Sequence, residues 1–436
     1  MKGLIFTYTL TVLGVVYGLL RPVYGASIYI ALSILKPPAL WHWSVSLGRY
    51  GFYVAVCSLI GWARQGFGQW EKLRKVRKVL YCVAIYAIIQ WISGYASRYS
   101  ADPRVWYHTR KLTNDMLMVL VVCSLINNFK ELRVYTWVIV AAAGYVAYEM
   151  NYSWYIEGYN RIWYAEFAEI DNNGMAMIFA MVVPLALTLG LSEKRYFWKV
   201  ASWIWIPFLG NAVFLAHSRG AMLGMCFSAP FLIWMLPDKR RTYWILAGAA
   251  IAILLLAGPS IQERFWSIFV DPNEQDASVN ARFTSWSAAW RCIQANPWLG
   301  VGPRCWHYVG RSYGAISGLA VHNVFMQVTA DSGVVAGLTL LGIYLLTIKY
   351  LFMERKTRSA YSWWYPYWAA GIAAGLGTGF LCSLFLSMER VEMPYYLAML
   401  GLATVKVATV EDRTPAPLTT MEELELLRVS RSAPAT

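Results

Sequence analysis

Residues 174–192 read GMAMIFAMVVPLALTLGLS, a run of 19 positions without a charged side chain. An α-helix needs about 20 mostly apolar residues to cross the hydrocarbon core of a bilayer. Twelve comparable runs lie elsewhere, at 4–20, 22–35, 46–63, 79–96, 112–127, 134–149, 200–216, 220–236, 243–257, 322–351, 365–387 and 395–409. The sequence therefore predicts an all-α polytopic membrane protein.

The composition agrees with this prediction. Of 436 residues, 58% are apolar and 14% are charged, whereas a soluble domain carries roughly 25% charged residues. Tryptophan (22) and tyrosine (29) are abundant, as expected where side chains lie between lipid and water. Most of the net charge of +14 comes from lysines and arginines in short loops between apolar runs, where they set the orientation of a membrane protein. We therefore expect membrane lipids, and not nucleic acid, as partners.

The basic loops orient the predicted helices. Loop 64–78 carries six basic residues against Glu71, so the positive-inside rule places it in the cytoplasm. Four further basic loops then fall on the same side: 128–133, 193–199, 237–242 and 352–362. About twelve spans with both termini in the cytoplasm follow, if 4–35 acts as one element broken at Arg21-Pro22. We expect 1–409 to form a single transmembrane domain and 410–436 a cytoplasmic tail.

The outer segment 97–111 departs from the charge rule. It holds Arg98, Arg104, Arg110 and Lys111 but only one acid, Asp102. Either these side chains reach to lipid phosphates, or they bind an anionic partner outside the membrane.

A long polar stretch, 258–321, forms the largest predicted outer loop, and loops of this size are usually functional. Within it, Phe283, Trp286, Trp290 and Ile293 recur at helical spacing, which predicts an amphipathic helix over 279–295 along the membrane interface. Asn296-Pro297 ends this helix. Cys292 and Cys305 share the loop, and either pair there or remain two free thiols.

Arg219, Arg282 and His322 are the ionisable residues of greatest interest at the predicted outer face. A guanidinium grips two phosphate oxygens at once, so arginines suit a diphosphate. Their simpler interpretation is an interfacial charge for Arg219 and a solvated helix face for Arg282. Ser218 or His217 is expected to cap the helix that follows Arg219. Histidine titrates near neutral pH, so His322 suits a general base or, more simply, a helix cap.

Metal and nucleophile signatures are weak in this sequence. No Cys/His spacing typical of a metal site occurs, and no Ser-His-Asp arrangement can be derived from spacing. Glu166, Glu169 and Asp171 are candidate metal ligands, but an acidic outer loop is the simpler interpretation. We therefore predict no metal site.

Four groups of residues follow one another along the chain: His217-Ser218-Arg219-Gly220-Ala221, Arg282 with Trp286, the stretch 296–302, and His322-Asn323 with Gly333. In this order they resemble the shared core of the O-antigen ligases and O-antigen polymerases, over about 200–345. The segment 171–174 also resembles the polar turn that these proteins carry before a core helix.

The resemblance implies a bundle of about a dozen helices in the bacterial inner membrane with a periplasmic active site. It implies an inverting, metal-independent glycosyltransferase without cofactor, which moves a glycan from undecaprenyl diphosphate to an acceptor hydroxyl. His322 would activate that hydroxyl, and Arg219 and Arg282 would hold the diphosphate. The further candidates for substrate binding are Arg161, Asn323, Arg291, Arg304, Arg98, Arg104 and Arg110.

The acceptor defines the kind of enzyme. A ligase transfers to lipid A-core oligosaccharide, a polymerase to another glycan repeat, and a protein O-glycosyltransferase to Ser or Thr. The basic segment 97–111 favours anionic lipid A-core, and hence an O-antigen ligase. Residues 20–25 resemble an exopolysaccharide-linked branch, so a polymerase is the alternative. A transporter of lipid-linked glycans is the alternative from another class, but such proteins show repeated halves with matching broken helices, and no internal repeat is visible.

Overall fold

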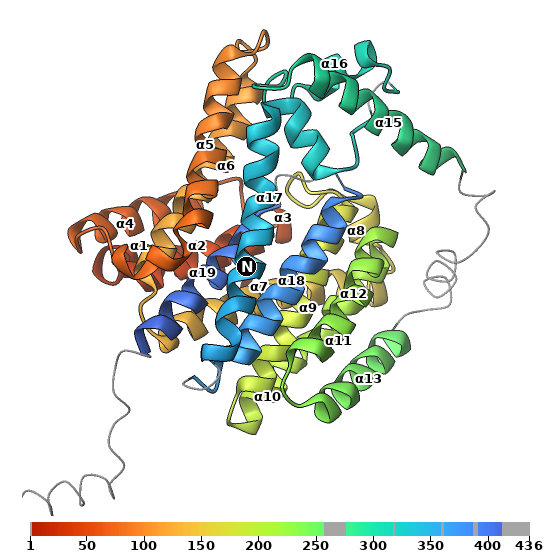
Figure 1. The fold of residues 1–436 in the computed structure, drawn as a ribbon. Helices are drawn as coiled ribbons and strands as arrows, with labels where there is room; N and C mark the ends of the chain where they lie inside the picture. The colour runs from red at the N-terminus through yellow and green to blue at the C-terminus, as the bar shows by residue number, and fades with distance from the viewer. Residues whose placement is uncertain (1, 257–275, 317–318, 359–361, 387–390, 412–436) are drawn as a thin grey trace, which may run out of the picture.

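The computed structural model describes residues 2–256, 276–316, 319–358, 362–386 and 391–411, and the longer helices in these ranges form one bundle (Figure 1). The described residues form no β-strand, only an isolated bridge between Phe167 and Ile170. The helices in chain order are α1 (Lys2–Leu20), α2 (Pro22–Leu35), α3 (Pro37–Leu40), α4 (Tyr50–Arg64), η1 (Glu71–Val76), α5 (Arg77–Ala96), α6 (Pro103–Leu125), α7 (Phe129–Tyr155), α8 (Arg161–Tyr164), α9 (Asn172–Ser192), α10 (Tyr196–Trp203), α11 (Trp205–Leu215), α12 (Arg219–Met235), α13 (Lys239–Leu256), α15 (Asp276–Ala295), α16 (Trp306–Val309), η3 (Gly310–Tyr313), α17 (Val324–Arg358), α18 (Tyr365–Ser383) and α19 (Met393–Glu411).

This architecture confirms an all-α membrane protein. Every apolar run of the sequence falls on one or more of these helices. Within the described residues, five helical stretches are long and apolar enough to cross a membrane: Lys2–Leu20, Pro22–Leu40, Glu71–Ala96, Asn172–Ser192 and Val324–Arg355. The count of about twelve spans stays a prediction. Of the expected tail 410–436, residues from 412 onward lie outside the described residues.

Helix α9 is the centre of the bundle, because 94% of its most apolar stretch is buried. It packs against α18, α11, α12 and α7. Small residues of α18 permit a close approach: a Cβ on Gly371 would lie 1.9 Å from Thr188 Oγ1, and a Cβ on Gly375 would lie 2.6 Å from the Met181 carbonyl oxygen. Small side chains at helix crossings are typical of membrane bundles.

The N-terminal helices correct one prediction. A Cβ on Gly25 would lie 2.3 Å from Gly18 Cα, and one on Gly14 would lie 2.9 Å from the Ile28 side chain. These pairs show that α1 and α2 pack antiparallel as a hairpin. The prediction that 4–35 acts as one broken element is therefore wrong, since Pro22 begins a new helix after the turn at Arg21 instead of kinking a continuous one.

The predicted cytoplasmic loops do lie together at one end of the bundle, here called the basic face. Lys75 pairs with Glu354 at 3.2 Å, and Arg133 with Glu193 at 2.7 Å. The Phe129 and Trp364 rings stack at 4.7 Å. These contacts join η1, α7 and α18 with the loops beside them, so the basic loops share one side of the molecule, as the charge pattern predicted.

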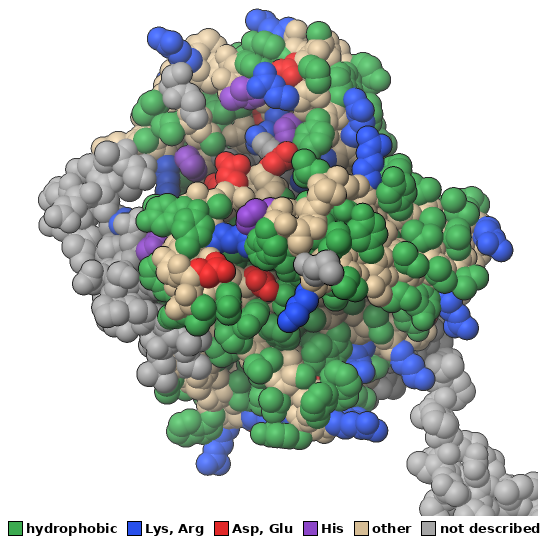
Figure 2. Space-filling model, turned by 180° about the vertical axis from the view of Figure 1, so that it is seen from behind, with side chains coloured by type: hydrophobic (Ala, Val, Ile, Leu, Met, Phe, Trp, Pro, Cys, Tyr) green, Lys and Arg blue, Asp and Glu red, His purple; other side chains and the backbone are tan. Residues whose placement is uncertain are grey.

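The other end of the bundle is the site face, where the loops 36–49, 97–102, 156–171, 216–218 and 319–323 meet. Seen from behind, acidic and histidine side chains gather in this upper half, and Lys and Arg side chains follow the lower rim (Figure 2). Helix α1 begins here, because Trp41 lies where a Cβ on Gly3 would point. Helix α19 ends at the basic face, where Lys406 Nζ donates to the Ser124 carbonyl. The prediction that both termini share one side is therefore wrong for the described chain.

Helix α17 was predicted as one span, 322–351, but it is broken at Gly333. The Phe325 and Tyr344 ring centroids are 5.8 Å apart, whereas 19 residues of straight helix would separate them by about 28 Å. The first part, 324–332, therefore folds back on the second. Gly333 has φ 87° and ψ 170°, a conformation that costs other residues steric strain.

The stretch 296–302 fills this break. The Val334 N–H donates to the Pro297 carbonyl at 2.8 Å, and the Gly302 N–H donates to the Asp331 carbonyl at 2.8 Å. Ser93 of α5 donates to the Leu299 carbonyl at 2.6 Å. The loop that follows α15 is thus fixed to α17 and α5 at the site face.

Candidate functional site

His322 stands immediately before the folded-back part of α17, with φ 55°. Hydrogen bonds through the side chains of Gln327 and Asp331 fix the residues on either side of His322. The Val321 N–H donates to Gln327 Oε1 at 3.2 Å, and the Gln327 amide donates to Asp331 Oδ2 at 2.8 Å. Asp331 Oδ1 accepts the Trp306 N–H at 2.8 Å. A non-glycine residue at positive φ persists only where its surroundings hold it, and this network supplies that support.

Arg282 of α15 and Asp171, which precedes α9, are the charged neighbours of His322. Burial lowers the pKa of the His322 imidazole below its usual value; the charge of Arg282 lowers this pKa further, and that of Asp171 raises it. Histidine is half-buried here. The ring is therefore kept neutral near pH 7, which is the form that accepts a proton.

Helix α15 lies across the top of the bundle (Figure 1). It buries Ala288 and Cys292, whereas Phe283 and Trp290 are 57% and 56% exposed. The structure thus confirms a helix over 279–295, and its position along the membrane interface stays a prediction. Cys292 and Cys305 are both buried and free, so the pairing left open by the sequence does not form.

Burial lowers the pKa of the Arg282 guanidinium. Two further polar groups follow Arg282 on α15. Ser285 Oγ and Trp286 Nε1 are buried and have no hydrogen-bond partner among the described residues. Such groups are costly unless a ligand or water satisfies them. They make this part of α15 a candidate surface for a polar ligand.

Arg219 begins α12 directly after the tight turn 216–218. Asn172 donates to the Ala216 carbonyl at 2.8 Å, and the His217 ring lies 5.0 Å from that of Trp163. Asp171, whose charge acts on His322, adjoins Asn172, so the turn before Arg219 lies beside a residue that influences His322. Ser218 occupies the N-cap position but its side chain makes no capping hydrogen bond, so the cap predicted for Ser218 is wrong, and the alternative, His217, stays a prediction.

The sequence analysis considered Asp171 as a candidate metal ligand and gave it no role beside His322. Its carboxylate caps α9 by accepting the Gly174 N–H at 2.8 Å. The signal for it was the N-cap pattern Asp171-Asn172-Asn173 before an apolar helix. The described residues contain no group of three or more potential metal ligands; Glu166 is exposed, and Glu169 contacts the Tyr107 hydroxyl at 3.5 Å.

Three of the other predicted binding residues have contacts within the protein. Asn323 caps α17 by accepting the Met326 N–H at 3.1 Å. Arg161 donates to the carbonyls of α3, at 3.1 Å for Leu40, and Arg291 donates to the Tyr313 carbonyl at 2.8 Å. These contacts place Arg161 at the end of α3 and Arg291 beneath η3.

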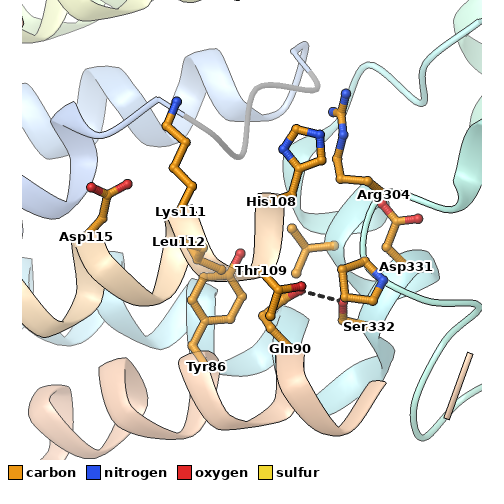
Figure 3. A pocket seen from close by; sticks show the side chains of 12 residues that line it. Tyr86, Gln90, His108, Thr109, Lys111, Leu112, Asp115, Arg304, Asp331 and Ser332 are labelled. Carbon is orange, nitrogen blue, oxygen red and sulfur yellow. Dashed lines mark hydrogen bonds between the residues drawn. The ribbon is translucent and has the colours of Figure 1, made fainter. Parts of the chain in front are cut away.

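Two of the remaining predicted residues, Arg104 and Arg304, line a cleft between α6 and the segment 303–308. Arg104 forms an ion pair with Asp102 at 3.0 Å and bonds to Tyr308. Arg98 and Arg110 are exposed. Arg304, with φ 62°, lines the cleft together with His108 (Figure 3). We call this hollow the Arg304 cleft.

The Arg304 cleft has an outer part of about 370 Å³ and a small inner extension of about 40 Å³. Lys111, Gln90 and Ser332 line the inner part, where Ser332 donates to Gln90 at 2.9 Å (Figure 3). His307, Leu319 and Gln327 line the outer part. The cleft therefore adjoins the segment that carries His322.

The comparisons with known proteins bear on this region. No curated protein matches the chain significantly. A family model described as O-antigen ligase matches residues 204–341, the range from α11 to the second part of α17, which includes Arg219, Arg282 and His322. The match confirms the resemblance seen in the sequence: over residues 204–341 the chain is similar to the O-antigen ligase family.

Proposed function

We propose that this chain is an inverting, metal-independent ligase that transfers an O-antigen glycan from undecaprenyl diphosphate to lipid A-core oligosaccharide. The observation that supports the proposal is that the charges of Arg282 and Asp171 act on His322, while Asn172, next to Asp171, bonds to the turn that precedes Arg219. In this proposal His322 supplies the base, and Arg219 and Arg282 supply the guanidiniums that bind the diphosphate.

The proposed reaction is a single displacement. As the acceptor oxygen attacks the anomeric carbon, its proton passes to the neutral His322 ring. The bond between that carbon and the diphosphate oxygen breaks, and the electron pair leaves with the diphosphate. Arg219 and Arg282 stabilise the charge that develops there, while the Asp171 carboxylate stabilises the imidazolium. One displacement inverts the anomeric carbon.

The membrane setting follows from the same arrangement. The basic loops lie together on the face opposite the site, and such loops favour the cytoplasm. We therefore place the site at the periplasmic face of the inner membrane. The exposed Phe283 and Trp290 of α15 suit the interface, where a lipid-linked donor arrives from the bilayer.

An acceptor comparison tests the proposal. The purified protein, in nanodiscs with an undecaprenyl-diphosphate glycan, is offered lipid A-core, a glycan repeat, or a Ser/Thr peptide. We expect transfer to lipid A-core to dominate, because Arg98, Arg104 and Arg110 lie on the site face. Dominant transfer to the glycan repeat would instead establish a polymerase, and no transfer to any acceptor would refute a transferase.

Arg282→Lys is expected to lower kcat/KM about 10-fold or more, because lysine keeps the charge but cannot grip two phosphate oxygens. Initial rates at subsaturating donor measure the effect. Arg311→Lys is the matched control, since Arg311 is exposed in the same outer segment and should retain the wild-type rate. Full activity of Arg282→Lys would assign Arg282 to a solvated helix face.

A further inference from the structure

Helix α8 and the turn before it present three aromatic rings at the upper end of the bundle (Figure 1). Tyr159, Trp163 and Tyr164 are 45%, 46% and 69% exposed. The rings of Tyr159 and Tyr164 are stacked, with their centroids 5.7 Å apart and their planes 25° apart. We call these three side chains the α8 platform. Its exposed rings form a surface that can receive the flat face of a ligand.

Hydrogen bonds hold the backbone beneath the α8 platform in place. Asn160 Oδ1 accepts the Trp163 N–H at 3.1 Å, and the Asn160 amide donates to the Leu215 carbonyl at 2.8 Å. The Ser153 hydroxyl donates to the Tyr159 carbonyl at 3.0 Å. A surface that is already ordered loses little conformational freedom when a ligand binds. The platform is therefore prepared for binding.

The α8 platform adjoins the turn that precedes Arg219. The ring centroids of Trp163 and His217 are 5.0 Å apart, with the rings edge to face. The Asn160 amide reaches Leu215, the last residue of α11 before the same turn. The first sugar of the donor is bonded directly to the diphosphate. A sugar on the platform would therefore lie beside the diphosphate that Arg219 is proposed to bind.

The charge around the α8 platform favours a sugar over a lipid headgroup. Aromatic rings also gather at membrane interfaces, so their exposure alone does not identify the ligand. Segment 156–171 carries four acids and one base, and Glu157, Glu166 and Glu169 are exposed. The base, Arg161, donates to a carbonyl of α3 at 3.1 Å. Carboxylates repel lipid phosphates, whereas they accept hydrogen bonds from sugar hydroxyls.

The aromatic side chains of α10 show the contrast. Tyr196 and Phe197 are 78% and 70% exposed at the basic face, and Lys194, Arg195 and Lys199 accompany them. Rings beside cations are typical of a membrane surface, where the cations meet lipid phosphates. The α8 platform combines its rings with acids instead, so contact with lipid phosphates does not account for it.

We propose that the α8 platform binds a sugar ring of the donor glycan, in the part of the glycan next to the diphosphate. The proposal rests on the proposed ligase function and names the surface that recognises the transferred glycan. One face of a sugar ring presents C–H groups, whose partial positive charge is attracted to the negative face of an aromatic ring. The hydroxyls at the edge of the sugar would meet the nearby carboxylates.

Tyr164→Ala tests the proposal with the full chain in nanodiscs, with an undecaprenyl-diphosphate glycan as donor and lipid A-core as acceptor. The Tyr164 ring is the most exposed of the three, so the variant should fold. We expect the KM for the donor to rise about 3- to 10-fold, the loss of one aromatic contact, and the KM for lipid A-core to stay unchanged. Tyr164→Phe keeps the ring and should keep the wild-type values.

Undecaprenyl diphosphate without a glycan separates the sugar from the rest of the donor. Used as a competitive inhibitor, it should have the same inhibition constant with Tyr164→Ala as with the wild type, because it offers no sugar to the platform. An equal rise in this constant and in the KM for the donor would assign the ring to the lipid or the diphosphate. That result, unchanged values throughout, or a rise only in the KM for lipid A-core would overturn the proposal.

Tyr196→Ala is the matched control, because it removes an exposed tyrosine at the opposite face of the bundle. It should change neither KM nor the inhibition constant. If Tyr196→Ala and Tyr164→Ala raised the KM for the donor equally, the effect would come from the membrane interface in general, and the sugar site would be refuted.

Saturation-transfer NMR with the glycan released from the donor provides a measurement that needs no transfer. The sugar protons should give strong contact signals with the wild-type protein and weaker ones with Tyr164→Ala. If the wild type shows this difference from the variant but transfers glycan to no acceptor, the ligase function fails and the sugar site stands. Equal signals from the two proteins would overturn the sugar site itself.

Discussion

His322→Ala should reduce kcat for glycan transfer by about 10²- to 10⁴-fold, the usual contribution of a general base. The acceptor proton would then have no neutral imidazole to receive it. The variant should remain folded, because Asn323 caps α17. Single-turnover rates, with a thermal melt of the same sample, measure both properties.

Two comparisons separate the base from the backbone. His322 has φ 55°, a region that asparagine tolerates better than alanine, so His322→Asn should fold well and still lack activity. His42→Ala, at an exposed histidine of the site face, should keep wild-type turnover. Near-normal turnover of His322→Asn would remove His322 from the reaction.

The pH dependence of the wild-type rate gives the same assignment independently. Burial and Arg282 lower the pKa of His322, so the neutral ring persists below the usual histidine range. The rate should therefore be flat around pH 7 and fall only as the pH drops through this lowered pKa. In the residual activity of His322→Asn, this fall in rate at low pH should be absent.

Gly333→Ala should be the most destabilising single substitution, costing about 3 kcal/mol or more. Alanine is strained at φ 87°, and its Cβ would lie 1.9 Å from the Trp298 carbonyl oxygen. Neither backbone can yield, because the Val334 N–H is bonded to the Pro297 carbonyl. A chemical-unfolding curve of the purified variant measures the loss.

Gly248→Ala is the matched control in helix α13, where no atom lies within 4 Å of an added Cβ. Alanine favours a helix interior by about 0.5–1 kcal/mol over glycine, so this variant should be as stable as the wild type or slightly more so. Equal stability of the Gly333 and Gly248 variants would mean that the break in α17 tolerates a side chain.

The apolar runs predicted the helices because a bilayer demands long apolar stretches. They did not predict how helices break. The stretch Val324–Arg355 is long and apolar enough to cross a membrane, yet it contains the triplet Asp331-Ser332-Gly333 where the chain reverses. Likewise, Arg21-Pro22 was interpreted as a kink, although the small residues Gly14, Gly18 and Gly25 indicate a closely packed hairpin.

The site was less accessible to sequence reasoning. Arg282 and His322 are separated by 40 positions, so spacing alone could not bring them together; the family resemblance selected them. Arg161 and Arg291 look like Arg219 in sequence, but they bond to backbone carbonyls of their own surroundings. Tertiary contacts of this kind leave no periodic signal.

The fastening of 296–302 into the break of α17 has a mechanical consequence. It joins α15 and the folded-back segment 324–332 into one unit, because the hydrogen bonds of the Gly302 and Val334 N–H groups connect the loop after α15 to α17. We therefore expect Arg282 and His322 to move together. Arg219 belongs to the separate α11–α12 hairpin. In the proposed mechanism, a small rotation of this unit would change the distance from Arg219 to Arg282 and His322 without changing the distance between Arg282 and His322.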